Sequence, residues 1–271
     1  MSPSEQTADQ PEQPEQPTME ELRGLAREIL ANLHSHVNDY TATLVKRERI
    51  GGRLGEEVRI QIKVRNPVAA VDPAIDSPAT TAVAEKKAVE SMGGMAAYLK
   101  FLEPRSMRGR EVIWVDGVND NKLIVHEAGF LNLMRVELAP HGKLAMLGNK
   151  YAITELGLLR LVEKLIEKID RGVDLSQCSI ATREDQMVGD RSCRIIQVTQ
   201  PRSVPGADFY IAQVFIDNQW QIPLRYAAFL WPENAGEPPP LEEEYTYLDL
   251  QLNVGLTDLD FDPDNPAYDY P

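Results

Sequence analysis

Hydrophobic and polar residues alternate along most of the chain, and this pattern predicts strands. Val58, Ile60, Ile62 and Val64 alternate with charged or amide side chains, as in a strand with one buried and one solvent-facing side. The same period, bounded by turn residues, predicts further strands near residues 40–50, 96–102, 111–116, 121–127, 134–138, 178–185, 193–199, 209–217, 223–230 and 243–251. Because short turns link most of these segments, we expect antiparallel pairing.

Two segments have the period of an amphipathic helix instead. A capping box that begins at Thr18, followed by apolar residues at three- and four-residue steps, predicts a helix over residues 19–34. A second helix is expected to open at Thr154 and to end at Gly172. Its apolar stripe consists of Leu158, Val162, Leu165 and Ile169. Residues 81–92 are compatible with a third, short helix.

The first hairpin determines which residues share the buried side of the sheet. A five-residue loop over 51–55 places Leu44 opposite Ile62, both on the dry face. Lys46 and Glu48 fall on the same face, nearer the loop. They are candidates for a polar rim or an ion pair, and a frayed strand end is the alternative.

The chain is expected to form one folded domain between polar ends. Residues 1–17 are rich in Gln, Pro and Glu and lack basic residues, which is typical of a disordered tether. Residues 18–265 form the domain, with a proline-punctuated excursion or lid at 66–94, and 266–271 form the end of an acidic tail. The pattern indicates an α+β fold in which a large curved antiparallel sheet packs two or three helices on its concave face.

Charge and composition exclude several classes of protein. The 271 residues contain 28 Lys and Arg against 42 Asp and Glu, a net charge of −14, which argues against nucleic-acid or anionic-membrane binding. No apolar run approaches the ~20 residues of a membrane span, so the protein is peripheral to a membrane at most. The polar spacer before the first helix favours a periplasmic or otherwise exported protein whose signal peptide is absent here, and a cytoplasmic protein is the alternative.

The motifs of common enzymes are missing from the sequence. It contains no nucleophile elbow, phosphate-binding loop or dinucleotide fingerprint. Cys178 and Cys193 lack the spacing of zinc ligands, and the strand geometry favours two small buried cysteines, with a disulfide between them as the alternative. We therefore expect no catalytic residues, no cofactor and no metal.

Three weaker patterns were weighed against this expectation. His34, His36 and Asp39 could ligate a metal but fit a surface connector better. Four aspartates have the spacing of a calcium loop in which Pro263 replaces the required glycine. They are Asp258, Asp260, Asp262 and Asp269. Carboxylates on or near dry strands, at Glu48, Glu111 and Asp116, support a minor acid–base alternative.

The apolar face of the predicted sheet gives the strongest functional signal. Two amphipathic helices have too little area to cover one face of about ten strands, so an apolar groove is expected to stay open. Such a groove suits an acyl chain, which gains about 0.8 kcal/mol per buried methylene. The candidate lining residues are Leu44, Ile60, Ile62, Leu99, Phe101, Trp114, Phe215 and Phe229.

Four segments resemble a known bacterial family. They are DYTATLVKRER (39–49), YLKFLEP (98–104), RGREVIWVDG (108–117) and LDFDPDNPAY (259–268). These segments look like the domain of unknown function 1571, which is itself similar to the outer-membrane lipoprotein carriers LolA and LolB. The resemblance implies an incomplete β-barrel with a helical lid over an apolar cavity.

Together these patterns predict a non-catalytic envelope protein that binds a lipid or lipoprotein acyl chain, as carrier or sensor. A protein-interaction module of an envelope complex, which would use the acidic tails and the sheet edge, is the first alternative. A cofactor-free enzyme that uses the cavity is the second. Fold analogy sets this order, and a fold alone does not establish a function.

Overall fold

The computed structural model describes residues 17–67, 94–128, 134–170, 177–201 and 206–271. This part of the chain contains one twelve-stranded sheet and two α-helices, α1 (Met19–His36) and α3 (Leu158–Asp170). The strands are β1 (Asp39–Ile50), β2 (Arg53–Leu54), β3 (Val58–Arg65), β4 (Ala96–Glu103), β5 (Glu111–Val115), β6 (Leu123–His126), β7 (Arg135–Leu138), β8 (Ser179–Val188), β9 (Arg191–Thr199), β10 (Ile211–Asp217), β11 (Pro223–Phe229) and β12 (Leu241–Leu252).

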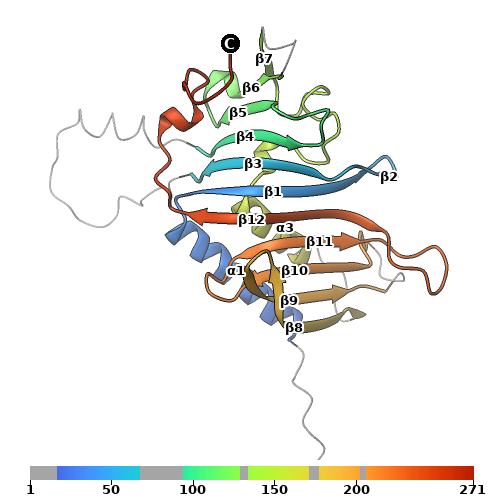
Figure 1. Ribbon diagram of the computed structural model, residues 1–271. Coiled ribbons are helices and arrows are strands. Elements are labelled where there is room, and N and C mark those ends of the chain that lie inside the picture. The colour runs from blue at the N-terminus through green and yellow to red at the C-terminus, as the bar shows by residue number, and fades with distance from the viewer. Residues whose placement is uncertain (1–16, 68–93, 129–133, 171–176, 202–205) are drawn as a thin grey trace, which may run out of the picture.

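The sheet is antiparallel and open. Its strand order is β7-β6-β5-β4-β3-β1-β12-β11-β10-β9-β8, with β2 paired to β1. The first and last long strands, β1 and β12, are therefore central neighbours, which ties the two ends of the domain together. Both helices lie on one face of the sheet, behind it in Figure 1. The predicted α+β class, the antiparallel pairing and the open, unclosed sheet are confirmed.

The start of α1 follows the predicted capping box. The backbone N–H of Glu21 donates to Thr18 Oγ1 at 3.2 Å, and the backbone N–H of Thr18 donates to the Glu21 carboxylate at 2.6 Å. Ala26, Ile29 and Leu33 are buried against the sheet. Local sequence therefore determines this helix, because its cap and its apolar stripe lie within one stretch of chain.

The first hairpin differs from the predicted register by two residues. Gly51 and Gly52 have φ of 57° and 81°, and they form a tight two-residue turn rather than part of a five-residue loop. That turn alone would place Leu44 opposite Arg59. One extra residue between β2 and β3 shifts the pairing, so Leu44 lies opposite Ile60 instead of Ile62. A shift of two residues leaves every side chain on its expected face, so the residues predicted for the buried face of the sheet still lie on that face.

The second helix begins four residues later than predicted. Residues Ile153–Glu155 form a single 3-10 turn, and Gly157 follows with φ of 107°. The backbone N–H of Leu158 then donates to the buried hydroxyl of Tyr40 on β1, at 3.0 Å. Because the residue that supplies this cap is 118 positions away in the sequence, no local pattern at Thr154 reveals it.

The C-terminal segment, 255–271, packs on strands β3–β7 of the opposite face of the sheet (Figure 1). The Tyr268 ring stacks on Tyr98 of β4 with centroids 4.0 Å apart, and Phe261 is buried beside them. Four aspartates of the segment pair with basic side chains of the sheet. These pairs are Asp258–Arg65, Asp260–Lys63, Asp264–Arg135 and Asp269–Lys100. The acidic tail is therefore bound along its length to the sheet.

Other predictions concern residues outside this description. Residues 1–16 of the predicted tether, 68–93 of the excursion with its short helix, and the expected helix end at Gly172 lie outside the described residues. Cys178 and Cys193 form no disulfide, and burial raises the pKa of the Cys193 thiol to about 11. Among the described helices, none combines the length and the apolar character that crossing a membrane requires.

Candidate functional site

A cavity of about 430 Å³ lies between the helix face of the sheet and a cover formed by α3 and residues 140–157. Its volume is within the range of roughly 300–1,000 Å³ that is typical of ligand pockets. Apolar side chains from six neighbouring strands form its floor: Leu44, Ile60, Leu99, Phe101, Val112, Leu123, Val125 and Leu138. The predicted apolar hollow above the sheet is therefore present, and the wall of this cavity is largely hydrocarbon.

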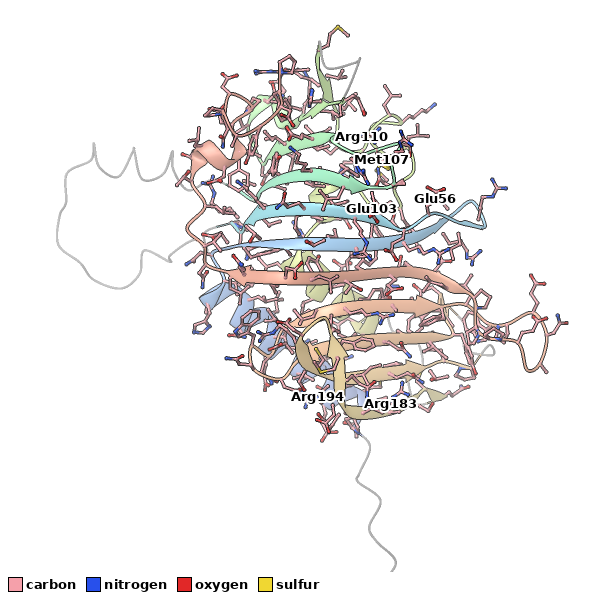
Figure 2. The ribbon with its side chains drawn as sticks, viewed as in Figure 1. Glu56, Glu103, Met107, Arg110, Arg183 and Arg194 are labelled. Carbon is pink, nitrogen blue, oxygen red and sulfur yellow. The ribbon has the colours of Figure 1, made fainter. Side chains whose placement is uncertain are left out.

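The mouth of the cavity exposes apolar residues to solvent. Leu144 and Leu147 line the cavity, yet they are 71% and 77% exposed. Arg110 and Glu127 line it near the β4–β5 loop and form an ion pair at 2.7 Å. Figure 2 shows Arg110 at the end of the sheet opposite the C-terminal segment. Exposed leucines beside an apolar cavity are a typical sign of an interaction site.

The predicted polar pair lies in the wall of this cavity. The Lys46 ammonium approaches the Glu48 carboxylate at 3.0 Å, and their side chains are 11% and 5% exposed. Glu48 also accepts hydrogen bonds from the Tyr245 hydroxyl at 2.6 Å and from the Lys150 backbone N–H at 3.1 Å. Lys46 donates to Asn149 Oδ1 at 2.8 Å. Two donors and one acceptor from neighbouring residues thus hold this buried ion pair in place.

A second buried carboxylate, Glu243 on β12, extends this polar wall. It lies 2.7 Å from the Lys150 ammonium and accepts a hydrogen bond from the Tyr151 hydroxyl at 2.9 Å. Burial and the charge of Glu243 raise the pKa of Tyr151, so its phenol stays protonated and donates at neutral pH. Burial alone lowers the pKa of Lys150, but hydrogen bonds to Glu242 and Glu243 outweigh it and raise that pKa.

Together the two carboxylates fasten residues 149–151 of the cover to the sheet. Glu243, Lys150 and Tyr151 are not among the residues predicted from the sequence. One signal was present, because Glu243 precedes Tyr245 and Tyr247 at two-residue steps and therefore shares their face of β12. Its lysine and tyrosine partners are more than ninety positions away in sequence, so no spacing rule finds them.

The structure places four of the apolar candidates in the cavity wall: Leu44, Ile60, Leu99 and Phe101. Ile62 and Trp114 are instead buried in the core. Phe215 lies between Val214 and Ile216, which face the helices, so alternation directs Phe215 to the opposite side of the sheet.

Phe229, the last apolar candidate, does not line either described cavity. It lies opposite Ile211 at the end of β11 and is half-buried.

A second, smaller cavity of about 110 Å³ lies between α1, α3 and strands β9–β11. Leu22 and Ile29 of α1, together with Ile196 and Val214 of the sheet, are part of its wall. Leu165, Lys168 and Tyr226 line both cavities. The two spaces are therefore neighbours with a common wall.

The weaker metal and acid–base patterns do not converge on one site. Among the described residues, no group of three or more His, Cys, Asp or Glu side chains could hold a metal ion. Asp39 accepts hydrogen bonds from the backbone N–H groups of Gly255 and Leu256. Glu111 is buried on the outer face, where the Tyr98 hydroxyl donates to it at 3.0 Å, so it lies across the sheet from Glu48.

Several solved structures are similar to this chain at low identity. A putative outer membrane lipoprotein-sorting protein domain from Vibrio parahaemolyticus is 11% identical, with a TM-score of 0.38 over 90% of this chain and 97% of that one. The LolA superfamily protein NE2245 from Nitrosomonas europaea is 12% identical, with a TM-score of 0.33 over 88% and 97%. The MucA/MucB complex from Pseudomonas aeruginosa matches at 13% identity and a TM-score of 0.43, over 89% and 60%.

A search of the curated proteins finds no match. A family model described as "Protein of unknown function (DUF1571)" matches residues 37–270. This range contains the whole sheet and the cavity floor, and the chain belongs to that family.

Proposed function

We propose that this protein binds the acyl chain of a lipid or lipoprotein in the larger cavity, as a non-catalytic carrier or sensor. The observation that carries the proposal is an apolar cavity of about 430 Å³ that opens beside exposed leucines. An alkyl chain gains about 0.8 kcal/mol for each methylene that leaves water. The charged side chains of the wall are paired with one another, so they stabilise the cover without needing the ligand.

A periplasmic or otherwise exported location is part of this proposal. Binding an acyl chain in an apolar cavity is useful where a lipid must cross an aqueous space, since free chains are costly to expose to water. The proposal requires no cofactor and no metal.

The test is a titration with a fluorescent palmitate analogue. Ala145 is half-buried in the cavity wall, so Ala145→Trp places an indole ring inside the space. Met187 on β8 is 58% exposed, and Met187→Trp is the matched control. We expect saturable binding at one site, weakened roughly tenfold or more by Ala145→Trp and unchanged by Met187→Trp. Absence of saturable binding, or equal binding by both variants, would overturn the proposal.

The exposed leucines at the mouth support a second candidate, an apolar segment of a protein partner. Leu144 and Leu147 would then bind the partner directly. Leu147→Ser would reduce recovery of a stoichiometric partner more strongly than it reduces palmitate binding. Loss of palmitate binding without any change in partner recovery would argue against this candidate.

A further inference from the structure

We propose that the ligand carries two ester-linked acyl chains, that one chain occupies each cavity, and that the ester branch lies where the cavities meet. This inference rests on the proposed function, because it assigns a ligand class to the same site. It adds the cavity between α1 and α3 as a second chain site and gives the common wall a role in recognition.

The first support is the position of α3 between the two cavities. Leu161 lines the larger cavity, whereas the adjacent Val162 lines the smaller one. Leu165 and Tyr226 line both. A ligand that branches at this wall can send one chain to each side of the helix.

The second support is the hydroxyl of Tyr226. This residue is 3% exposed, and its hydroxyl has no well-aligned hydrogen-bond acceptor among the described residues, although the Glu243 carboxylate lies close enough to interact with it. Burial, then the charge of Glu243, raise the pKa of the phenol, so it remains a donor at neutral pH. A buried donor without an acceptor is destabilising. An ester carbonyl at the junction supplies a well-aligned acceptor, whereas an alkyl chain does not.

The third support is a charged residue beside the junction. Lys168 lines both cavities, its side chain is 24% exposed, and its ammonium lies 3.1 Å from the Asp208 carboxylate. Its stem is thus in the apolar space while its charge reaches solvent, which is common for lysine. The position of Lys168 therefore gives the polar head group of a two-chain ligand a path to solvent.

The size of the second cavity fits part of a chain. About 110 Å³ is several times the roughly 10–15 Å³ that holds one water molecule. Leu158 and Leu159 are fully packed at the start of α3, but Leu165 and Ile166 farther along are only half-buried. The second half of α3 therefore has fewer packing contacts to lose if it shifts to admit more of the chain.

The experiment compares two competitors for the fluorescent palmitate analogue, namely palmitate and dipalmitoylglycerol. Val214 is half-buried and faces the second cavity, so Val214→Trp fills it. Gln213→Trp is the matched control, because Gln213 is also half-buried but points to the opposite face, where it donates to Gln197. Ala212→Leu is a milder second variant at the same cavity, and circular dichroism checks the fold of each.

We expect dipalmitoylglycerol to bind the wild-type protein at least roughly tenfold more tightly than palmitate. Val214→Trp and Ala212→Leu should remove or reduce this advantage and leave palmitate binding unchanged, while Gln213→Trp changes neither. Tyr226→Phe should weaken the binding of dipalmitoylglycerol roughly two- to tenfold. The binding of its dialkyl ether analogue, which lacks the carbonyl groups, should not change.

Two results would overturn the inference. If palmitate binds but the diester has no advantage, the second chain site is wrong while the proposed function stands. If Val214→Trp weakens the binding of palmitate and of dipalmitoylglycerol equally, the second chain site is likewise wrong while the proposed function stands. If neither competitor displaces the probe, the proposed function itself fails and this inference fails with it.

Discussion

Buried charges are the residues on which the cavity wall depends most. Lys46 and Glu48 lie two residues apart on the cavity face of β1, and both are almost entirely removed from water. A buried ion pair contributes little net stability, but removing one partner leaves the other charge buried and unpaired. The wall is therefore sensitive to single substitutions at these positions.

Glu48→Ala should lower the free energy of unfolding by about 3–5 kcal/mol, because the Lys46 ammonium and the Tyr245 hydroxyl lose their acceptor. Urea denaturation measures this. Glu57→Ala removes an exposed partner of Arg59 and should change stability by about 1 kcal/mol or less. Similar losses in the two variants would show that the buried network is not a special feature of the wall.

Asp217 at the end of β10 makes a pH-dependent contribution to stability. Burial alone raises its pKa, but hydrogen bonds from Arg191 and from the Trp220 backbone N–H outweigh it and hold the pKa below the ordinary value of 3.8. A depressed pKa in the folded state means that this stabilisation is complete above that ordinary value. It is lost as the pH falls through the folded pKa.

Asp217→Asn should therefore be less stable than the wild type by about 1–3 kcal/mol at neutral pH. The difference should shrink in acid, because the wild type loses the same contribution there. Urea midpoints measured between about pH 2.5 and 7 test this. Asp120→Asn, at an 88% exposed carboxylate, is the control and should show little change at any pH. A constant difference across this range would contradict the assignment.

Elements with local signals were predictable, and those with remote partners were not. The alternation of β3 and the capping box of α1 lie within short stretches, and both elements formed where expected. The register of β1 on β3 depended on a two-glycine turn that the sequence suggested less clearly than a longer loop. The start of α3 depended on Tyr40, more than a hundred positions earlier, which no local pattern could reveal.

Tyr40→Phe tests that remote cap. The phenylalanine keeps the ring in the core but leaves the Leu158 backbone N–H without its acceptor, so we expect a loss of about 1–3 kcal/mol in unfolding free energy. Hydrogen exchange at the Leu158 amide should also become faster. Tyr210→Phe removes a half-buried hydroxyl elsewhere and serves as the comparison. Unchanged protection of Leu158 in Tyr40→Phe would show that the cap does not set the start of α3.

At the scale of the whole molecule, the two faces of the sheet have different roles. The helix face holds the cavities, and the C-terminal segment packs on the β3–β7 part of the outer face. Composition and alternation predicted that part of one face would stay uncovered, since helix area can be compared with strand number. They could not predict which four of eight apolar candidates line the hollow, because bulges and side-chain direction decide this.

The C-terminal segment should act as a structural strap. Tyr268→Ala removes the ring stacked on Tyr98 and should lower unfolding free energy by about 3–5 kcal/mol, measured by urea denaturation. Palmitate binding should persist at concentrations where the variant is folded, because the strap lies across the sheet from the cavity. Val254→Ala, at a 42% exposed position, is the control. Full stability of Tyr268→Ala would mean that the tail is free to serve another purpose.

The central claim is that the larger cavity holds an acyl chain in the cell. Native mass spectrometry of protein purified without detergent from its own cells tests it most directly. The account predicts a wild-type protein that carries one lipid per chain and an Ala145→Trp variant that carries none, with Met187→Trp like the wild type. A wild-type protein that arrives without lipid, and takes up none when palmitate is added, would contradict it.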